Sequence, residues 1–299
     1  MTFHRKMNIQ ELRRQLERPN TTSVLETIDV HSGERTTLRH FDCVIEAPNW
    51  TSDGQRLIYN SGGLIFAYEF STDAISKIET GIAIDCNNDH VLSPDGTELA
   101  ISNFDAHDAL SRIYILPVGG GEPRLVTHEG PSYLHGWSPD GKRLAYCAQR
   151  HDSYDIYTID RSGGHEERLT STPGLDDGPE YSPDGRYIWF NSTRSGLMQI
   201  WRMNVNGEEQ KQVLHEDANC WFPHVSPDGK WIAYIAYAKG DVEPMDHPPN
   251  RHVELRIAST EGGPSRLLAK LFGGQGTMNV NSWSPDSTQL ALVSYRTKA

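Results

Sequence analysis

The sequence has 299 residues and carries 28 Lys and Arg against 40 Asp and Glu, a formal charge of −12. Length alone predicts about two domains of average size or one larger all-β unit. Hydrophobic residues make up only 36%, whereas 26 Gly, 17 Pro, 7 Trp and 12 Tyr favour many short strands and turns over long helices. The acidic balance disfavours non-specific binding to nucleic acid or to an anionic membrane surface.

Residues 1–21 form an extension ahead of the first predicted strand. An apolar stripe of Ile9, Leu12 and Leu16 predicts a short helix over residues 8–18. A secretory signal needs about 7–15 consecutive apolar residues and a membrane helix roughly 18, and the sequence has neither run. The four cysteines are scattered, with no CxxC pair. These features predict a soluble protein of a reducing compartment, the cytoplasm.

One motif recurs six times in the rest of the chain, residues 22–299. Its copies read WTSDGQRLIY (50–59), LSPDGTELAI (92–101), WSPDGKRLAY (137–146), YSPDGRYIWF (181–190), VSPDGKWIAY (225–234) and WSPDSTQLAL (283–292). The steps between the motif aspartates are 42, 45, 44, 44 and 58 residues. A period of about 40–45 residues is typical of a four-stranded propeller blade.

The motif has the chemistry of a tight turn. Ser supplies a capping hydroxyl, Pro presets φ, and Asp and Gly close the turn between two strands. Because turn propensity explains every residue in the motif, we interpret the six aspartates as structural, neither catalytic residues nor calcium ligands.

After each turn the sequence predicts three more strands, and five blades are complete in chain order. The chain ends after the second strand of the sixth repeat, while residues 22–39 have the pattern of a third and a fourth strand. The predicted fold is therefore all-β: a six-bladed β-propeller of four-stranded blades, closed by N-terminal strands that pair with the C-terminal strands. Such closure leaves no open sheet edge.

These tandem SPDG-type repeats with GG…RLT endings resemble the propeller of TolB-like proteins over residues 22–299. The resemblance implies the fold and a protein-binding propeller. Related repeats also occur in propellers attached to prolyl-oligopeptidase-type hydrolases and in oligogalacturonate lyases. The sequence departs from TolB because it lacks the N-terminal domain and the signal peptide. It departs from the hydrolases because it lacks a GxSxG elbow.

The SPDG turns are short and uniform, so binding is expected on the opposite face, which carries the less regular connections. Positions seven and five residues before each motif Asp share one side of the innermost strand by period-two geometry. Together with the neighbouring His224, these positions predict a ring of ligand-binding candidates at the mouth of the axis: Glu46, Asn88, His90, Tyr133, His135, Asp177, Trp221, His224 and Asn279. Small polar residues that merely line a wet channel explain the pattern equally well.

The 58-residue step comes from an insertion at residues 240–252, which includes Asp246 and His247. Insertions on one face of a repeat array often mark its binding side, although loops also tolerate them at little cost. The run FGGQG at 272–276 lacks the Lys-Ser/Thr end of a phosphate loop, and we expect close backbone packing there.

The favoured function is a non-catalytic module that binds a small molecule, a saccharide or a protein segment at the axis mouth. No cofactor, nucleic acid or membrane partner is expected. The alternative is a metal-dependent lyase or hydrolase acting on a carbohydrate, in which His90 and His135, with Asp89 or Asp177, hold a divalent ion. Elsewhere, Cys220 is expected to be a buried apolar residue, and Arg150, Arg194 and Arg296 are either anion ligands or solvated loop ends.

Overall fold

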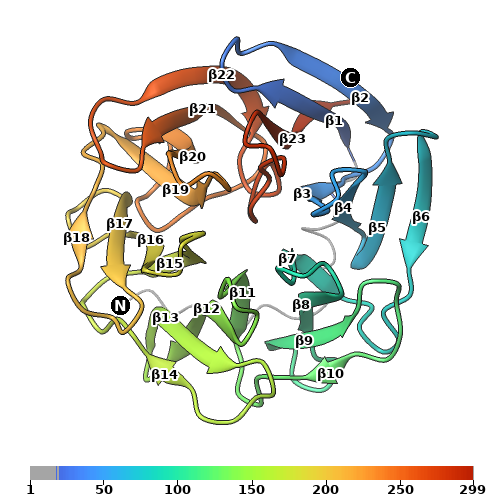
Figure 1. Ribbon diagram of the computed structural model, residues 1–299. Coiled ribbons are helices and arrows are strands. Elements are labelled where there is room, and N and C mark those ends of the chain that lie inside the picture. The colour runs from blue at the N-terminus through green and yellow to red at the C-terminus, as the bar shows by residue number, and fades with distance from the viewer. Residues whose placement is uncertain (1–17, 19, 299) are drawn as a thin grey trace.

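The computed structural model describes residue 18 and residues 20–298, and these form a ring of six β-sheets around a central axis (Figure 1). Five sheets have four antiparallel strands in the order in which they occur in the chain. The all-β six-bladed propeller is thereby confirmed. The predicted helix over residues 8–18 lies outside the described residues except for Arg18, which is not helical.

The five complete blades follow one another around the ring. Blade one contains β3 (Glu46–Trp50), β4 (Arg56–Ser61), β5 (Leu64–Glu69) and β6 (Ala74–Ile78). Blade two contains β7 (Cys86–Leu92), β8 (Glu98–Phe104), β9 (Ser111–Pro117) and β10 (Arg124–Leu125). Blade three contains β11 (Ser132–Trp137), β12 (Arg143–Arg150), β13 (Ser153–Asp160) and β14 (Glu167–Arg168). Blade four contains β15 (Asp176–Tyr181), β16 (Tyr187–Ser192), β17 (Gln199–Asn204) and β18 (Lys211–Gln212). Blade five contains β19 (Ala218–Val225), β20 (Trp231–Ala238), β21 (Arg251–Ser259) and β22 (Arg266–Gly273).

The sixth blade joins the two ends of the described chain, as the sequence predicts. Its outer three strands are β23 (Gln289–Thr297), β1 (Thr21–Asp29) and β2 (Arg35–Phe41). β1 pairs with β23 without a register break from Thr21 opposite Thr297 to Asp29 opposite Gln289. The innermost position is taken by the segment 277–283, which is attached to β23 by an isolated bridge and a few backbone hydrogen bonds. Figure 1 shows this red segment running close to the axis.

The SPDG turns form because one hydroxyl and one carboxylate satisfy the backbone of the turn. In blade three, Ser138 Oγ donates to Asp140 Oδ1 at 2.6 Å and accepts from the Arg143 amide at 2.9 Å. The same Asp140 oxygen accepts from the Lys142 amide at 3.1 Å. These hydrogen bonds hold the pKa of Asp140 down at about 2. The structural role predicted for the motif aspartates is therefore visible in their contacts.

The core is divided among the spaces between neighbouring sheets, where apolar side chains of adjacent blades interdigitate. Indole groups also link blades by hydrogen bonds, since Trp137 Nε1 donates to the Val91 carbonyl at 3.0 Å and Trp283 Nε1 to the His224 carbonyl at 2.9 Å. The described part of the chain has no helix with the length and apolar character needed to cross a bilayer.

Candidate functional site at the axis mouth

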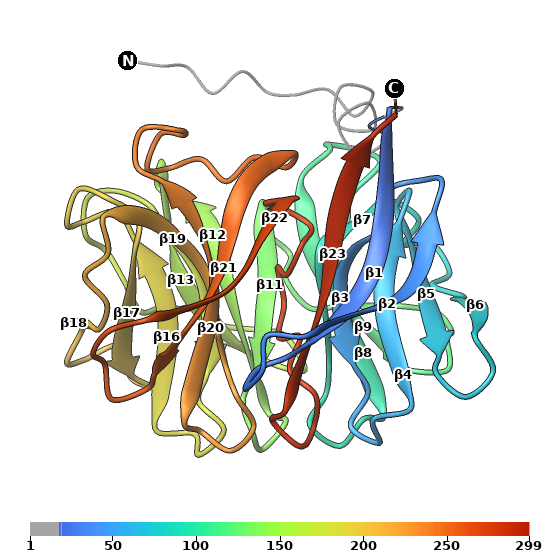
Figure 2. The ribbon, with the colours of Figure 1, turned by 90° about the horizontal axis from the view of Figure 1, so that it is seen from above.

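The two faces of the ring differ in their connections (Figure 2). The SPDG turns lie on one face and have nearly the same length. The opposite face, here called the mouth face, carries the connections from the second to the third strand of each blade and from each blade to the next. The longest of them joins β20 to β21 and contains the predicted insertion. The connections that vary in length and sequence therefore lie on the mouth face.

The innermost strands of the five complete blades are interrupted by β-bulges near the axis mouth. The register shifts lie between Glu46 and Asn49 in β3, Cys86 and His90 in β7, Asp177 and Glu180 in β15, and Trp221 and His224 in β19, with a corresponding shift in β11. A bulge adds a residue and rotates the side chains that follow it. The strict two-residue alternation used to predict the ring therefore does not hold through these strands.

The predicted ring residues are mostly covered rather than exposed around an open channel. Tyr133 is half-buried, and the other eight are buried: Glu46, Asn88, His90, His135, Asp177, Trp221, His224 and Asn279. Trp221 lies in the apolar core between blades, together with Phe222 and Met278. A ligand on this face therefore first meets the loops above the ring.

The charged centre of the mouth is an imidazole–carboxylate pair. His135 Nε2 lies 3.2 Å from Asp177 Oδ1, which also accepts from the Gly178 amide at 2.7 Å. Burial disfavours the charged imidazole, but the hydrogen bond and charge of Asp177 outweigh it, and the pKa of His135 is raised. Burial likewise opposes ionisation of Asp177, yet the same contact leaves the pKa of that carboxyl lowered. Each side chain thus stabilises the charged form of the other.

Asp89 lies in the electrostatic range of this pair but has a different protonation state. The pKa of Asp89 is raised to about 7, mainly because the carboxyl group is buried. The charge of His135 acts against this rise, and the charge of Asp177 adds to it. Asn87 supports the carboxyl by donating from Nδ2 to Oδ2 at 2.7 Å. Burial also lowers the pKa of His90 to about 4, so the His90 imidazole is neutral. Neither of its ring nitrogens has a hydrogen-bond partner. The mouth thus combines the His135–Asp177 pair with one carboxyl group, Asp89, whose pKa lies near neutral pH, and with a neutral His90 imidazole.

The insertion at 240–252 brings His247 to this cluster. Its ring centroid lies 4.2 Å from that of Trp221 and 5.2 Å from that of Phe222, and its Nδ1 has no hydrogen-bond partner. Tyr237 holds the insertion by donating to the Pro248 carbonyl at 2.9 Å. These contacts place the His247 ring against two side chains of the innermost strand β19.

A second polar cluster lies deeper along the axis and joins three blades. His224 Nδ1 lies 2.7 Å from Glu180 Oε2, and its Nε2 lies 3.1 Å from the Met278 carbonyl. Asn281 donates to Glu180 Oε1 at 2.7 Å. Neither residue was among the ligand-binding candidates. Asn281 stands five residues before the motif Asp286, one of the positions from which the ring was predicted, whereas the bulge in β15 ahead of Glu180 cannot be read from the repeat alignment. Their mutual hydrogen bonds give this cluster a structural role.

The Gly-rich run at 272–276 packs closely against the mouth, as expected. A Cβ atom at Gly274 would lie 2.3 Å from the Pro248 carbonyl oxygen, and one at Gly276 would lie 2.6 Å from Glu46 Oε1 and 2.2 Å from the Tyr295 hydroxyl. Both glycines also have positive φ values, 104° and 88°. The backbone therefore approaches the Glu46 carboxylate to a distance that only glycine permits.

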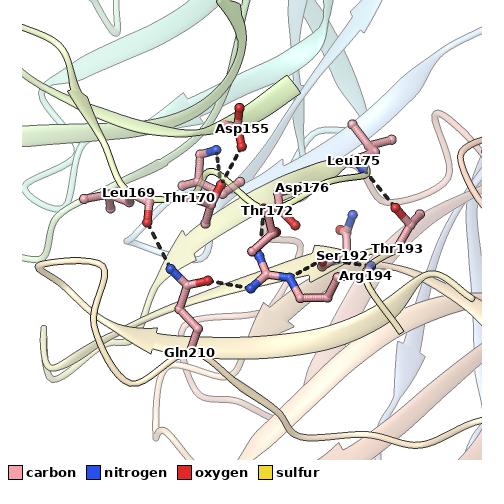
Figure 3. A network of polar contacts seen from close by, with 12 residues as sticks. Asp155, Leu169, Thr170, Thr172, Leu175, Asp176, Ser192, Thr193, Arg194 and Gln210 are labelled. Carbon is pink, nitrogen blue, oxygen red and sulfur yellow. Dashed lines mark hydrogen bonds and ion pairs between the residues drawn. The ribbon is translucent and has the colours of Figure 1, made fainter. Parts of the chain in front are cut away.

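Of the three arginines considered as anion ligands, Arg150 and Arg194 are engaged inside the fold, whereas Arg296 is exposed near the end of β23. Arg194 donates to Asp176 Oδ2 at 2.7 Å and to Gln210 Oε1 at 2.5 Å, in a network that links blades three and four (Figure 3). Arg150 pairs with Glu166 at 2.8 Å and donates to the Pro131 carbonyl at 2.9 Å. These two side chains are structural links and are not available to an anionic ligand.

The three buried thiols are not reactive groups, whereas Cys43 is exposed. Cys86, Cys147 and Cys220 are buried, and burial raises the pKa of each thiol, to about 12 for Cys86. The expectation that Cys220 is a buried apolar residue is confirmed by its full burial. Among the residues that the structure describes, no group of three His, Cys, Asp or Glu side chains is arranged to hold a metal ion.

The ring of four-stranded blades, the SPDG turns and the closure through β1 and β23 define a six-bladed propeller of the TolB type. The profile of the TolB beta propeller domain matches residues 91–266. The chain therefore belongs to the TolB beta propeller domain family.

Its relatives extend this similarity over most of the chain. An uncharacterized protein of Agrobacterium fabrum is 44% identical over 274 residues, which are 91% of this chain and 92% of that protein. A solved structure from Agrobacterium tumefaciens, provisionally named TolB, has a TM-score of 0.88 and 44% identity over 92% of this chain and 99% of its own. The Tol-Pal system protein TolB of Francisella tularensis is 26% identical over 128 residues, which are 42% of this chain but only 29% of that protein.

A more distant structure shares the fold alone. Oligogalacturonate lyase in complex with manganese superposes with a TM-score of 0.55 and 16% identity, over 83% of this chain and 73% of the lyase.

Proposed function

We propose that this propeller is a non-catalytic binding module whose ligand docks on the mouth face, over the axis. Of the candidate ligands, a protein segment is favoured over a small molecule or a saccharide. The proposal includes a cytoplasmic location, without nucleic-acid or membrane partners.

The observation that carries this proposal is unused hydrogen-bonding capacity at the mouth. Buried polar atoms usually find a partner, and each exception calls for an explanation. Several of the described exceptions belong to mouth-face residues that are not fully buried: His247 Nδ1, Asn250 Oδ1, and Nε and Nη1 of Arg18. On the SPDG face, by contrast, the repeated Ser and Asp side chains are fully engaged in the turns. A docked ligand that reaches the mouth would supply the missing partners.

A protein segment is favoured because the mouth face also exposes apolar side chains. Ile82 is 72% exposed, Ile84 54% and Met245 50%, and all three belong to connections on this face. Apolar anchors next to directional polar groups are the usual composition of a peptide-binding surface. One relative, TolB of Francisella tularensis, is a protein of the Tol-Pal system.

The proposal is tested by screening the purified protein against three probe sets: a peptide array, a panel of neutral and acidic oligosaccharides, and a small-molecule collection. Thermal shift and fluorescence anisotropy report binding. Met245→Glu and His247→Ala are expected to weaken any ligand found by about tenfold or more, since both alter the mouth. Lys142→Ala, an exposed residue of an SPDG turn, is the matched control. A ligand insensitive to both mouth variants, or one lost in the control, contradicts the proposal.

The lyase or hydrolase alternative receives no specific support from the described residues. His90 and His135 are not joined by a third metal-binding side chain in a suitable arrangement, and His135 is committed to Asp177. The shared fold with a manganese-containing lyase does not carry over that chemistry.

A further inference from the structure

Arg18 lies in the mouth, where it contacts residues from two blades. Its guanidinium pairs with Glu46 through Nη2 and lies over the Tyr295 ring, 4.9 Å from the ring centroid. The side chain of Arg18 is 9% exposed and that of Glu46 only 3%. Asn60 donates to the second oxygen of Glu46 at 3.3 Å, and Gly276 leaves space beside the first. A carboxylate next to an aromatic face is the combination that binds a planar guanidinium.

Arg18 fills this pocket incompletely. A guanidinium carries five N–H donors, and a buried donor without a partner costs free energy. Nε and Nη1 of Arg18 are buried and have no hydrogen-bond partner. Its backbone also has a φ of 28°, outside the conformations that residues other than glycine prefer. Arg18 therefore occupies the site with two donor groups unsatisfied and a backbone conformation that is unfavourable for arginine.

The charge balance of the mouth favours a cation as ligand. Without Arg18, Glu46 loses the ion-pair partner that the structure shows, while His135 is already paired with Asp177. Asp89 lies close enough to interact with Glu46 and adds a further negative charge when it ionises. An uncompensated buried carboxylate is unfavourable, so a cation that replaces Arg18 is stabilised there.

We propose that Glu46, Tyr295 and Gly276 form a guanidinium-binding site that Arg18 occupies in cis, and that the arginine of a docking protein segment takes this site when Arg18 leaves. This inference rests on the proposed binding function, for which it names the ligand chemistry. It also makes Arg18 an intramolecular competitor, which reduces the apparent affinity for the external ligand.

The experiment titrates methylguanidinium and methylammonium into the wild-type protein, Arg18→Ala and the double variant Arg18→Ala with Glu46→Gln, with binding followed by NMR. Arg18→Ala is expected to bind methylguanidinium about tenfold more tightly than the wild type, and to prefer it over methylammonium by about tenfold. The double variant is expected to lose this binding. Equal affinity in the wild type and in Arg18→Ala, or no preference for guanidinium, overturns the inference.

A second pair of variants keeps the test decisive if the double variant does not fold. In the Arg18→Ala background, Tyr295→Phe retains the aromatic face and should retain binding, whereas Tyr295→Leu should weaken it. Two further probes separate the possible sources of the guanidinium: free L-arginine, and an arginine tripeptide with both ends blocked. Tighter binding of the tripeptide supports a protein segment, and tighter binding of free arginine overturns that part of the inference.

The two proposals fail in different ways. If screening finds a mouth-face ligand that Arg18→Ala and Glu46→Gln do not affect, the binding function stands and the guanidinium site falls. If methylguanidinium binds as expected but no larger ligand depends on Met245 or His247, the site stands and the proposed function falls.

Discussion

At the scale of single residues, the protonation states around the axis differ because burial and charge act in different proportions on each group. Asp177 has a cationic partner within hydrogen-bond distance and stays ionised, whereas Asp89 has an amide neighbour and holds its proton much further up the pH scale. Burial raises the pKa of both carboxyl groups, and only Asp177 has a partner whose hydrogen bond and charge outweigh it. The difference leads to a prediction on pH.

The wild type is expected to become less stable as the pH rises, because buried Asp89 ionises. Asp89→Asn is expected to abolish this pH dependence. Folded Asp89 keeps its proton up to about pH 7, whereas an unfolded aspartate releases it near pH 3.9. Between these values the folded state binds more protons, so the wild-type free energy of unfolding falls with rising pH. Between about pH 5 and pH 8, the free energy of unfolding of the variant should therefore rise by on the order of 2 kcal/mol relative to that of the wild type.

Urea unfolding at both pH values measures this difference. Asn preserves an acceptor for Asn87, and Asp140→Asn is the comparison on the SPDG face, where the pKa is lowered rather than raised. An Asp89→Asn protein with the same pH dependence as the wild type would contradict the assignment.

Trp221→Ala is expected to destabilise the fold rather than to remove a ligand contact alone. The indole is fully buried in the core between blades, and loss of such a side chain costs about 3–5 kcal/mol. Chemical denaturation should show this loss, while Tyr133→Ala, at a half-buried ring, should cost less. Equal losses for the two variants would show that Trp221 does not have the core role described here.

At the scale of elements, each SPDG turn is a small unit closed by its own hydrogen bonds. Ser138→Ala removes the hydroxyl that links Asp140 to the Arg143 amide and should lower the free energy of unfolding by about 1 kcal/mol. Ser138→Thr should be nearly neutral, because Thr51 makes the same contacts in blade one. Ligand binding on the mouth face should not change in either variant.

The insertion between β20 and β21 depends on a few specific contacts. Tyr237→Phe removes the hydrogen bond to the Pro248 carbonyl and should expose residues 241–250 to faster hydrogen exchange, with a local loss of about 1 kcal/mol. Tyr234→Phe on the same strand is the matched control, since its hydroxyl donates to Glu216 instead. Increased exchange of the insertion in both variants, or in neither, would contradict this attachment.

The strands and turns could be predicted from the sequence more fully than the residues of the mouth. The turn motif and its period predict the blades, because each turn residue has a local conformational reason that the sequence displays. The mouth is harder to predict, because the bulges between Glu46 and Asn49 or Trp221 and His224 change which side chains face the axis. The contact of Arg18 with Glu46 and Tyr295 joins positions far apart in the sequence, and no local pattern announces it.

At the scale of the whole molecule, the ring depends on pairing between the two ends of the described chain. β23 and β1 share nine register pairs, and the Lys298 amide donates to the Asn20 carbonyl at 2.7 Å. The end of β23 thus lies beside the start of β1, and a short linker could join the two strands. A propeller closed in this way does not require its chain break to lie within blade six.

A circular permutant tests this directly. Residues 298 and 20 are joined by a short Gly-rich linker, and the chain is opened between Asp42 and Cys43, so that blade six becomes continuous and the ring loses no strand. The permutant should unfold cooperatively, with a free energy of unfolding within about 2 kcal/mol of the wild type, because the linker closes only a small gap. The matched control, a chain lacking residues 1–41, leaves β23 as an unpaired edge and should aggregate or fail to unfold cooperatively. A control as stable as the permutant would show that the pairing of β1 with β23 is not what holds the ring closed.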